Sequence, residues 1–359
     1  MRIQRLELAD FRNYEKADVE FGPGLTAVVG ANGQGKSNLV EAVAYLATRE
    51  SFRGVPGPAL VRNGCERAFV RAEVEQGDGR VVSIECELPT RGRDRVLVNK
   101  QRLQRAADLL GVVRATVFSP DDLALIKDGP ALRRRFLDEV AVSLHPGRDA
   151  DRRDLERILR HKSMLLKQIG GRLGDETAFT LDVWDAKLAD VGDRVGQARA
   201  ELVEAVAPHV SQAYADLAGG ASEVTVCYQP PWRSVGLAAA LLDARADEVR
   251  RQVCLVGPHR DELDVHLAGL PSRTHASQGE QRTLALALRL AAHRLVTERV
   301  GSAPVLLLDD VFSELDAARS AALLHHLPVG QIILTTAGPL PAGARTERTL
   351  RVEQGRLSG

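Results

Sequence analysis

The stretch that decides the fold is GANGQGKS, residues 30–37. It fits the pattern GxxxxGK[ST] in full, follows the apolar run LTAVV at 25–29, and opens the segment SNLVEAVAYLAT, whose apolar residues recur at helical spacing. A strand before the loop and a helix after it are the context that the phosphate-binding motif requires. Glycines let backbone amides turn toward a phosphate, and the helix N-terminus adds positive partial charge. We therefore expect a P-loop that binds a nucleotide; a glycine turn that binds nothing is the alternative.

The loop predicts distinct roles for its last two residues. Lys36 would reach the β- and γ-phosphate oxygens as a catalytic residue, and the Ser37 hydroxyl would bind Mg²⁺. This motif alone does not separate kinases, GTPases and ATPases. The residues expected to contact the nucleotide here are Gly30, Ala31, Asn32, Gly33, Gln34, Gly35, Lys36 and Ser37.

A second motif, VLLLDD at 305–310, is an apolar strand that ends in two carboxylates. In a Walker B strand, Asp309 would help to hold Mg²⁺, and Asp310 would polarise or position the attacking water. Taken alone, the pattern also suits a buried strand whose acids cap the next turn. Its pairing with the loop at 30–37 favours the catalytic interpretation.

The segment SQGEQ, at 277–281, narrows the class of ATPase. Ser277 and Glu280 fit a capping box at the start of the apolar helix that follows. The segment also resembles the signature loop of ABC ATPases, with Ala276 in place of the leading leucine, and SELD at 313–316 follows like a D-loop. This resemblance implies that a second subunit's ATP is contacted by Ser277, Gln278, Gly279, Glu280 and Gln281. ATP would then drive homodimerisation.

Longer segments resemble the RecF family of bacterial recombination-repair proteins. The quoted motifs lie within such segments at 6–53, 277–291 and 305–316, and VFSPDDLALIKDGPALRRRFLD and VGPHRDEL also match. The resemblance is weakest at 149–230. It implies an ABC/SMC-like head with a lobe II insertion and no long coiled coil, and it implies that Arg12 and Asn13 contact the nucleotide.

The same resemblance implies the activity and the partners. It predicts a weak, DNA-dependent ATPase that dimerises with ATP and prefers double-stranded DNA or gapped junctions. RecR, acting with RecO, is the implied protein partner, and the outcome is the loading of RecA at gaps. An SMC-like tether without this mediator role is an alternative. A transporter ATPase subunit is a weaker one, because Asp310 replaces the usual Glu, Thr335 and Thr336 replace the switch histidine, and no Q-loop glutamine is evident.

The distribution of patterns predicts an α/β fold with an inserted helical part. Strand signals lie near both ends, whereas residues 149–207 contain no proline and suit an antiparallel helical arm broken near 170–174. We expect an ABC-type head at 1–117 and 251–359 and a mainly helical lobe II at 118–250. Strands are expected at 2–8, 25–29, 67–74, 80–88, 95–98, 253–256, 263–267, 305–308 and 331–335, and helices at 279–299 and 316–326.

Composition limits the remaining possibilities. The 48 lysines and arginines equal the 48 aspartates and glutamates, so the chain does not coat DNA through bulk positive charge. The zero net charge does not exclude a local basic patch that binds DNA. The alternative for each basic cluster is a solvated face whose charges are paired with nearby acids. One cluster contains Arg91, Arg93, Arg95, Lys100, Arg102 and Arg105, and another contains Arg133, Arg134, Arg135, Arg152 and Arg153.

The chain carries no signal for secretion or for membrane insertion. Its first residues lack an apolar h-region, and no apolar run reaches the roughly 18–20 residues of a membrane span. The four cysteines show no CxxC pairing, so neither a zinc site nor a disulfide framework is indicated. We expect a soluble cytoplasmic protein.

Overall fold

The computed structural model describes residues 1–220 and 222–358, which form two compact units. Unit 1 contains residues 1–123 and the described residues of 209–222 and 278–359. Unit 2 contains residues 124–208 and the described residues of 223–277. Unit 1 is thus assembled from both ends of the chain, as the positions of the motifs predict.

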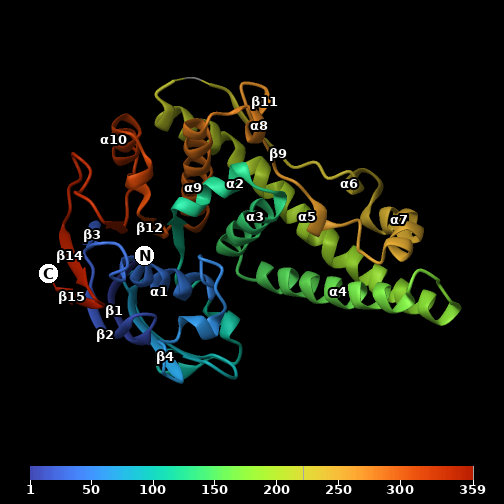
Figure 1. The fold of residues 1–359 in the computed structure, drawn as a ribbon, viewed down its shortest axis with the longest axis horizontal. Coiled ribbons are helices and arrows are strands. Elements are labelled where there is room, and N and C mark those ends of the chain that lie inside the picture. Colours follow the sequence, from blue (N-terminus) through green and yellow to red (C-terminus); the bar gives the residue numbers. More distant parts are fainter. Residues whose placement is uncertain (221, 359) are drawn as a thin grey trace. The chain divides into compact units, whose positions relative to one another are not determined.

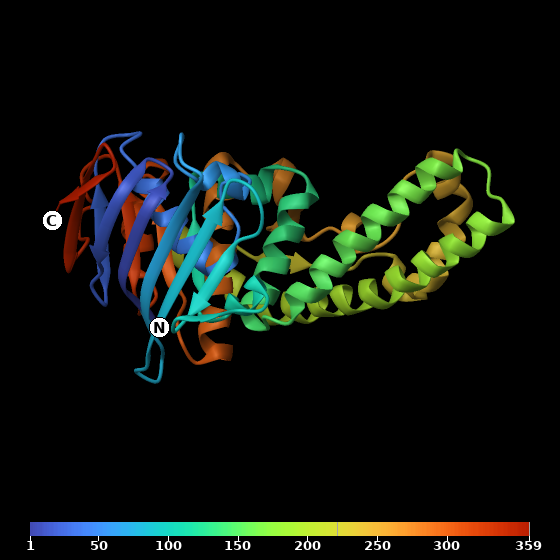
Figure 2. The same ribbon diagram turned by 90° about the horizontal axis from the view of Figure 1, so that it is seen from below.

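Unit 1 contains an antiparallel sheet with the strand order β2-β1-β4-β5-β6-β7 (Figure 2). Burial alternates along β4, where Val70 and Val74 are buried while Arg67 lies on the opposite face, as one-sided sheets require. The strands are β1 (Arg2–Phe11), β2 (Tyr14–Glu20), β4 (Arg67–Glu75), β5 (Val81–Pro89), β6 (Arg95–Val98) and β7 (Gln101–Arg102).

A second sheet of unit 1 has the order β15-β14-β3-β13-β12-β8 and is parallel apart from β15. Every residue of β12 and β13 is buried, as expected for parallel strands covered on both faces. The strands are β3 (Leu25–Val29), β8 (Ala115–Phe118), β12 (Val305–Asp309), β13 (Ile332–Thr336), β14 (Arg348–Glu353) and β15 (Arg356–Ser358).

Helix α1 (Lys36–Thr48) lies between the two sheets (Figure 1). It contacts β8, β12 and β13 on one side and β1 on the other, and its apolar residues belong to one core with both sheets. Unit 1 also contains α9 (Gln278–Val300), α10 (Ala317–His325) and the short 3-10 helices η1 (Gly57–Leu60), η2 (Ala106–Leu109), η3 (Pro120–Leu123) and η5 (Val311–Glu314). This packing holds the first residue of α1 at the carboxyl ends of β3 and its neighbours.

Unit 2 is mainly helical, and two long helices dominate it (Figure 2). Helix α4 (Arg148–Ile169) and helix α5 (Asp175–Ala218) are separated at residues 170–174, so the predicted break is confirmed. Pro208 lies inside α5, where it donates no backbone hydrogen bond, and the helix continues to Ala218. The boundary of unit 2 also falls at Pro208. The other elements are α2 (Ala124–Lys127), α3 (Pro130–Leu144), α6 (Trp232–Val235), α7 (Leu237–Arg251), α8 (Ser272–His275), η4 (Pro258–Arg260), β9 (Val224–Cys227), β10 (Asp264–Leu267) and β11 (Leu270–Pro271).

A buried charge network joins α4, α5 and α7 inside unit 2. Lys162 Nζ lies 2.6 Å from Asp185 Oδ1 and 2.6 Å from Glu248 Oε2. Burial lowers the pKa of Lys162, but the two carboxylates outweigh burial and the net pKa is raised. The ammonium therefore stays charged and links α4, α5 and α7 through its two carboxylate contacts.

One predicted strand is wrong. Residues 253–256 form an irregular segment, because side chains satisfy its backbone groups in place of a neighbouring strand. The carbonyl of Cys254 accepts hydrogen bonds from the Arg260 guanidinium, and the Leu255 amide donates to Glu248 Oε1 at 2.7 Å. Apolar spacing alone does not reveal such competition from side chains.

The compact units do not end where the expected lobes end. Strand β10 pairs with β9, so residues 251–277 join unit 2, although the expected head included them. Asp216 on α5 accepts from Arg294 on α9 at 2.9 Å, so the end of α5 joins unit 1. As a division into functional lobes, 1–117 with 251–359 against 118–250 stays a prediction. No helix in the described part of the chain combines the length and the hydrophobicity that a membrane span requires.

Candidate nucleotide-binding site

The loop at 30–37 connects β3 to α1, and its conformation depends on glycine. Gly33 and Gly35 have φ values of 78° and 123°, which L side chains rarely adopt. A Cβ on Gly30 would lie 2.4 Å from the Val352 carbonyl oxygen, and one on Gly35 would lie 2.7 Å from Asn13 Nδ2. The loop is therefore packed between the β1–β2 turn and β14, with its own backbone curled as a phosphate cradle requires.

The Lys36 side chain folds into this curl. Its Nζ donates to the Gly30 carbonyl at 2.8 Å and to the Ala31 carbonyl at 2.9 Å. Burial lowers the pKa of Lys36, whereas the carboxylates of Asp310 and Asp309 act in the opposite direction. The ammonium and both acidic residues thus share one small region at the mouth of the loop.

Ser37 and Asp309 are in direct contact. The Ser37 hydroxyl donates to Asp309 Oδ1 at 2.8 Å, and the Thr335 hydroxyl donates to the same oxygen at 2.7 Å. Burial raises the pKa of Asp309, and these two hydrogen bonds only partly offset the effect of burial. Serine and aspartate oxygens are hard ligands that suit Mg²⁺.

Ser37 and Asp309 supply only two oxygen ligands, so a bound metal ion would need further ligands from the nucleotide and from water. Within the described residues, no group of three or more His, Cys, Asp and Glu side chains gathers closely enough to hold a metal ion. Mg²⁺ commonly uses one or two protein oxygens together with substrate phosphates and water. The pair of Ser37 and Asp309 fits such a shared site and does not fit a cage made of protein alone.

Asp310 has a left-handed backbone, with φ 52°, directly after β12. Its amide donates to the Thr335 hydroxyl at 3.0 Å. Thr335 is fully buried and therefore holds Asp309 and Asp310 at the same time. The sequence predicted only that Thr335 lies at the end of a strand. In the parallel register Thr335 pairs with Asp309, so its hydroxyl positions both acidic residues.

Arg12 and Asn13, in the β1–β2 turn, were both expected to contact the nucleotide, but their side chains have different partners. Asn13 contacts the loop, because its Nδ2 donates to the Gln34 carbonyl at 2.8 Å. The Arg12 guanidinium instead binds buried Glu41 on α1, at 2.7 Å and 2.9 Å. Arg12 is thus directed to the body of α1 and not to the loop itself.

Arg53 is a cation near the site that none of the sequence motifs contains as a predicted site residue. It follows α1 in the chain, is exposed, and donates through Nη1 to Asn38 Oδ1 at 3.1 Å. Its charge lowers the pKa of Asp309, although burial of that carboxyl outweighs it. No pattern in the sequence marks Arg53, because its proximity depends on the return of the chain after a 13-residue helix.

The signature-like segment is placed at the start of α9. Ser277 directly precedes the first helical residue, Gln278, as the capping interpretation expects. Arg282 Nη2 donates to Glu314 in the D-loop-like segment at 2.5 Å, and Arg319 Nε donates to the Thr283 hydroxyl at 3.0 Å. A Cβ on Gly279 would lie 3.0 Å from Arg319 Nη2. The first turn of α9 is thereby braced against residues 314–319, and Gln278, Glu280 and Gln281 lie on that turn.

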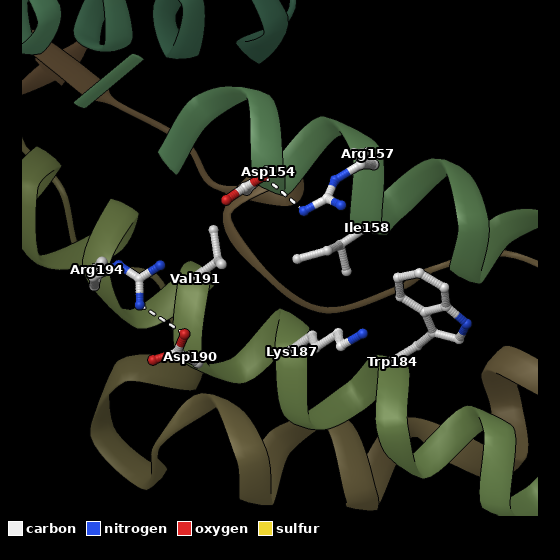
Figure 3. Close-up of a pocket in the computed structure, with 8 residues that line it drawn as sticks. All are labelled: Asp154, Arg157, Ile158, Trp184, Lys187, Asp190, Val191 and Arg194. Carbon is white, nitrogen blue, oxygen red and sulfur yellow. Dashed lines mark hydrogen bonds and ion pairs between the residues drawn. The ribbon is translucent and has the colours of Figure 1, made fainter. Parts of the chain in front are cut away.

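A separate hollow lies between α4 and α5 (Figure 3). Its cations already have partners: Arg157 contacts Asp154 at 2.7 Å, and Arg194 contacts Asp190 at 2.7 Å. Lys187 Nζ lies 5.0 Å from the centre of the Trp184 ring. Because these charges are matched internally and no glycine loop or helix start is present, the hollow does not compete with the loop at 30–37 as a nucleotide site.

The fold and this site define the chain as a P-loop ATPase head of the ABC/SMC type with an inserted helical part, and the residues that the structure describes contain no long coiled coil. A sequence model of the RecF/RecN/SMC N-terminal domain matches residues 2–339, and the chain belongs to that family.

Curated relatives lie on the RecF branch of this family. The chain is 44% identical over 352 residues to the DNA replication and repair protein RecF of Streptomyces avermitilis, covering 94% of this chain and 93% of the relative. It is 40% identical over 381 residues to the RecF of Kineococcus radiotolerans, covering 98% and 97%.

Solved structures agree. A structure described as the recombination mediator protein RecF-ATPrS in the RecFOR pathway matches with a TM-score of 0.91 at 29% identity, covering 99% of this chain and 97% of that one. The Smc head domain from Pyrococcus furiosus matches with a TM-score of 0.59 at 19% identity, covering 99% and 95%, and so shares the fold.

Proposed function

We propose that this chain is an ATP-dependent switch that holds DNA during recombinational repair and the repair of replication gaps. The observation that carries the proposal is the convergence of Lys36, Ser37 and Asp309 at one loop in a chain of the RecF branch. The relatives are named as DNA replication and repair proteins, and two solved relatives are described as RecF-ATPrS and RecF-ATP in the RecFOR pathway.

The loop would bind the nucleotide through its own backbone and one cation. The amides of residues 30–37 would face the phosphates, and the Lys36 ammonium would exchange its two carbonyl contacts for phosphate oxygens. Asn13 would fix the loop by its hydrogen bond to Gln34. Ser37 and Asp309 would hold Mg²⁺, which would neutralise charge on the β- and γ-phosphate oxygens.

Asp310 would act on the attacking water. Its amide is held by Thr335, so the residue is fixed next to Asp309 at the end of β12. Its side chain is one methylene shorter than the glutamate of transporter ATPases, which supports slow turnover. We infer that hydrolysis serves to release a closed state and that DNA accelerates it.

A second copy of the chain would complete the site. In ABC-type heads, the start of the signature helix contacts the γ-phosphate held by the other subunit, and here that start is braced by the contacts Arg282–Glu314 and Arg319–Thr283. ATP would therefore bind the closed dimer more tightly than the monomer, which is the differential affinity that a switch requires. The closed dimer would hold double-stranded DNA or a gapped junction, and with RecR and RecO it would promote loading of RecA.

Sedimentation tests this proposal. Wild type should dimerise only with ATP, whereas Ser277→Arg should bind ATP with normal affinity and stay monomeric. The matched control is Ser234→Arg, an exposed serine of unit 2, which should dimerise like wild type. A wild-type chain that stays monomeric with ATP would contradict the switch.

The mediator role needs a separate measurement. Pull-down with RecR, with and without ATP and DNA, should recover the chain most strongly when both are present. If RecR never binds, the chain acts as an ATP-dependent tether, and the ATPase chemistry proposed above is unaffected.

A further inference from the structure

A strip of cations lies along one edge of the antiparallel sheet in unit 1. We call it the β6–β7 basic edge, and its members are Arg91, Arg93, Arg95, Lys100 and Arg102, all of them exposed. Strand β7 is the last strand of its sheet. Within the described residues, none of these five side chains forms an ion pair.

Strand register places several of the cations on one face. Val96 is buried, so its neighbours Arg95 and Leu97 project from the opposite, outer face of β6. Arg102 is directly opposite Leu97 in the antiparallel pair and therefore projects from the same face. Lys100 sits in the turn between β6 and β7 with φ 66°. The cations thus follow β6 and the edge strand on the side away from the core.

Two nearby carboxylates, those of Asp94 and Glu87, already have other partners. Asp94 is the one acidic residue between 89 and 105, and its Oδ2 accepts from Tyr45 and from Arg49, each at 2.6 Å. Glu87, opposite Arg95 on β5, contacts Arg67 at 2.7 Å. Since Asp94 turns toward α1 and Glu87 toward β4, the basic edge keeps its charge.

The second basic cluster, at 133–135 and 152–153, behaves in the opposite way. Arg133 is buried and binds Glu262 at 2.7 Å, and Arg135 binds Glu139 at 2.8 Å. Arg152 and Arg153 both contact the Asp149 carboxylate. Of these pairs, only Arg133–Glu262 joins separate parts of the chain, and the others lie within single helices. Because acids match its charge, this cluster offers less net charge to a partner than the basic edge does, although the two look alike in the sequence.

The side chains of the β6–β7 basic edge suit the phosphate backbone of a nucleic acid better than its bases. Residues 89–105 contain no Phe, Tyr or Trp on which an unstacked base could rest, so single-stranded recognition by stacking has no platform there. Arginine forks suit phosphate oxygens, and exposed Gln101 and Gln104 add neutral donors. An alternative role for cations on an edge strand is to prevent pairing with the sheet of another molecule. This role would explain Lys100 and Arg102, but it would not explain Arg91 and Arg93, which lie in the loop before β6.

We propose that the β6–β7 basic edge is the surface through which this chain contacts the phosphate backbone of duplex DNA. The proposal rests on the proposed function, since it assigns a surface to the DNA contact made there. Each chain contributes several phosphate contacts, and two chains closed around ATP double that number. Binding is independent of base sequence, because backbone contacts fix position without reading bases.

The test compares two variants of the full chain that change net charge by the same amount. The edge variant carries Arg93→Gln, Arg95→Gln, Lys100→Gln and Arg102→Gln. The control variant carries Arg135→Gln, Arg157→Gln, Arg194→Gln and Arg250→Gln, at exposed or half-exposed arginines that are all paired with acids. Binding to a 30-base-pair duplex is measured with ATP at several salt concentrations, and ATP affinity reports that each variant is folded.

The edge variant should lose about tenfold or more in duplex affinity. The slope of log affinity against log salt should fall by about 4 if the cations of one chain contact the duplex, and by about 7 if both chains of the ATP dimer do. The control variant and wild type should agree, and all three proteins should bind ATP equally. Equal losses of duplex affinity in both variants would show an effect of net charge and would contradict the proposed DNA contact at the basic edge. An edge variant that binds duplex like wild type would contradict it too. If wild type itself fails to bind duplex with ATP, the proposed function is wrong as well.

Discussion

The Ser37 hydroxyl donates a hydrogen bond to the Asp309 carboxylate at 2.8 Å, although 272 positions separate the two residues in the chain. Strand order explains the contact. Strand β13 pairs in parallel with β3 on one side and with β12 on the other, so the loop after β3 and the two acids at the end of β12 lie at the same edge of the sheet. The hydrogen bond between Ser37 and Asp309 therefore depends on the pairing of β3, β13 and β12.

Removal of the Asp309 charge tests the metal site. Asp309→Asn keeps the shape and the hydrogen bond to Ser37 but loses the anionic oxygen, so Mg²⁺-dependent ATP affinity should fall about 10- to 100-fold. Titration of ATP with Mg²⁺ and then with EDTA measures the difference. In EDTA the variant and wild type should bind ATP alike; a deficit that persists without metal would show that Asp309 supports the loop and not the ion.

Thr335 should affect turnover more than binding. Thr335→Val removes the hydroxyl that donates to Asp309 and accepts from the Asp310 amide, and it keeps the side-chain shape. We expect kcat for ATP hydrolysis to fall roughly tenfold, because the Asp310 amide loses its partner and Asp310 is no longer fixed at the end of β12. ATP affinity should change much less, because the Asp309 carboxylate and its hydrogen bond to Ser37 stay in place. Thr335→Ser should restore most of the rate.

The neighbouring residue provides the control for Thr335. Thr336 is also buried, but its hydroxyl contacts only Gly338 among the described residues. Thr336→Val should therefore leave kcat close to that of wild type. Equal losses at both positions would mean that the end of β13 matters for packing alone.

The hairpin of β14 and β15 should control ATP affinity through the loop. The amides of Gln354 and Gly355 donate to the Gln34 side chain and carbonyl, at 2.6 Å and 3.0 Å. Gly355 has φ 73°, and a Cβ there would lie 2.6 Å from the Asn13 carbonyl oxygen. Gly355→Ala should push the hairpin and the β1–β2 turn away from the loop and weaken ATP binding several-fold.

Gly343→Ala is the matched control for this substitution. Gly343 has φ 89° but meets no heavy atom within 4 Å of an added Cβ. Both variants should lose about 1 kcal/mol or more of unfolding free energy from backbone strain. Only Gly355→Ala should weaken ATP binding, as measured by isothermal titration; a parallel loss in Gly343→Ala would assign the effect to strain.

His293 should make the protein sensitive to acid. Burial within α9 lowers the pKa of His293 from 6.5 to about 4, and its Nδ1 contacts the Thr116 hydroxyl at 3.0 Å. Between pH 6.5 and about 4 the unfolded chain takes up a proton at this histidine and the folded chain does not. The free energy of unfolding therefore falls as pH falls through this window, by about 3 kcal/mol at most from this residue.

His293→Gln stays neutral and keeps polar atoms near Thr116, so it should flatten this part of the pH profile. Thermal denaturation at a series of pH values between 7 and 4 measures the slope. His325→Gln, at an exposed histidine of α10, should leave the slope unchanged. An unaltered slope in His293→Gln would mean that other groups cause the acid sensitivity.

Local motifs predicted much of the fold. The glycine pattern at 30–37, the apolar strand before Asp309 and the proline-free helical region each follow from short-range spacing, and the structure has β3, β12 and the α4–α5 pair there. Strands such as β2, β8 and β14 were not expected, since their pairing depends on distant partners. Residues 253–256 were expected to be a strand but are irregular, because Glu248 and Arg260 satisfy their backbone groups.

The sequence by itself determined the chemical class of this protein, because a P-loop and an acidic strand end need particular residue types at fixed spacings. Only the tertiary structure decided which polar groups meet. It joined Thr335 to both acids, directed Arg12 to Glu41, and left one basic cluster exposed while it paired the other with acids. Spacing along the chain specifies a helix or a turn, whereas the charge that a cluster presents depends on acids that only folding brings beside it.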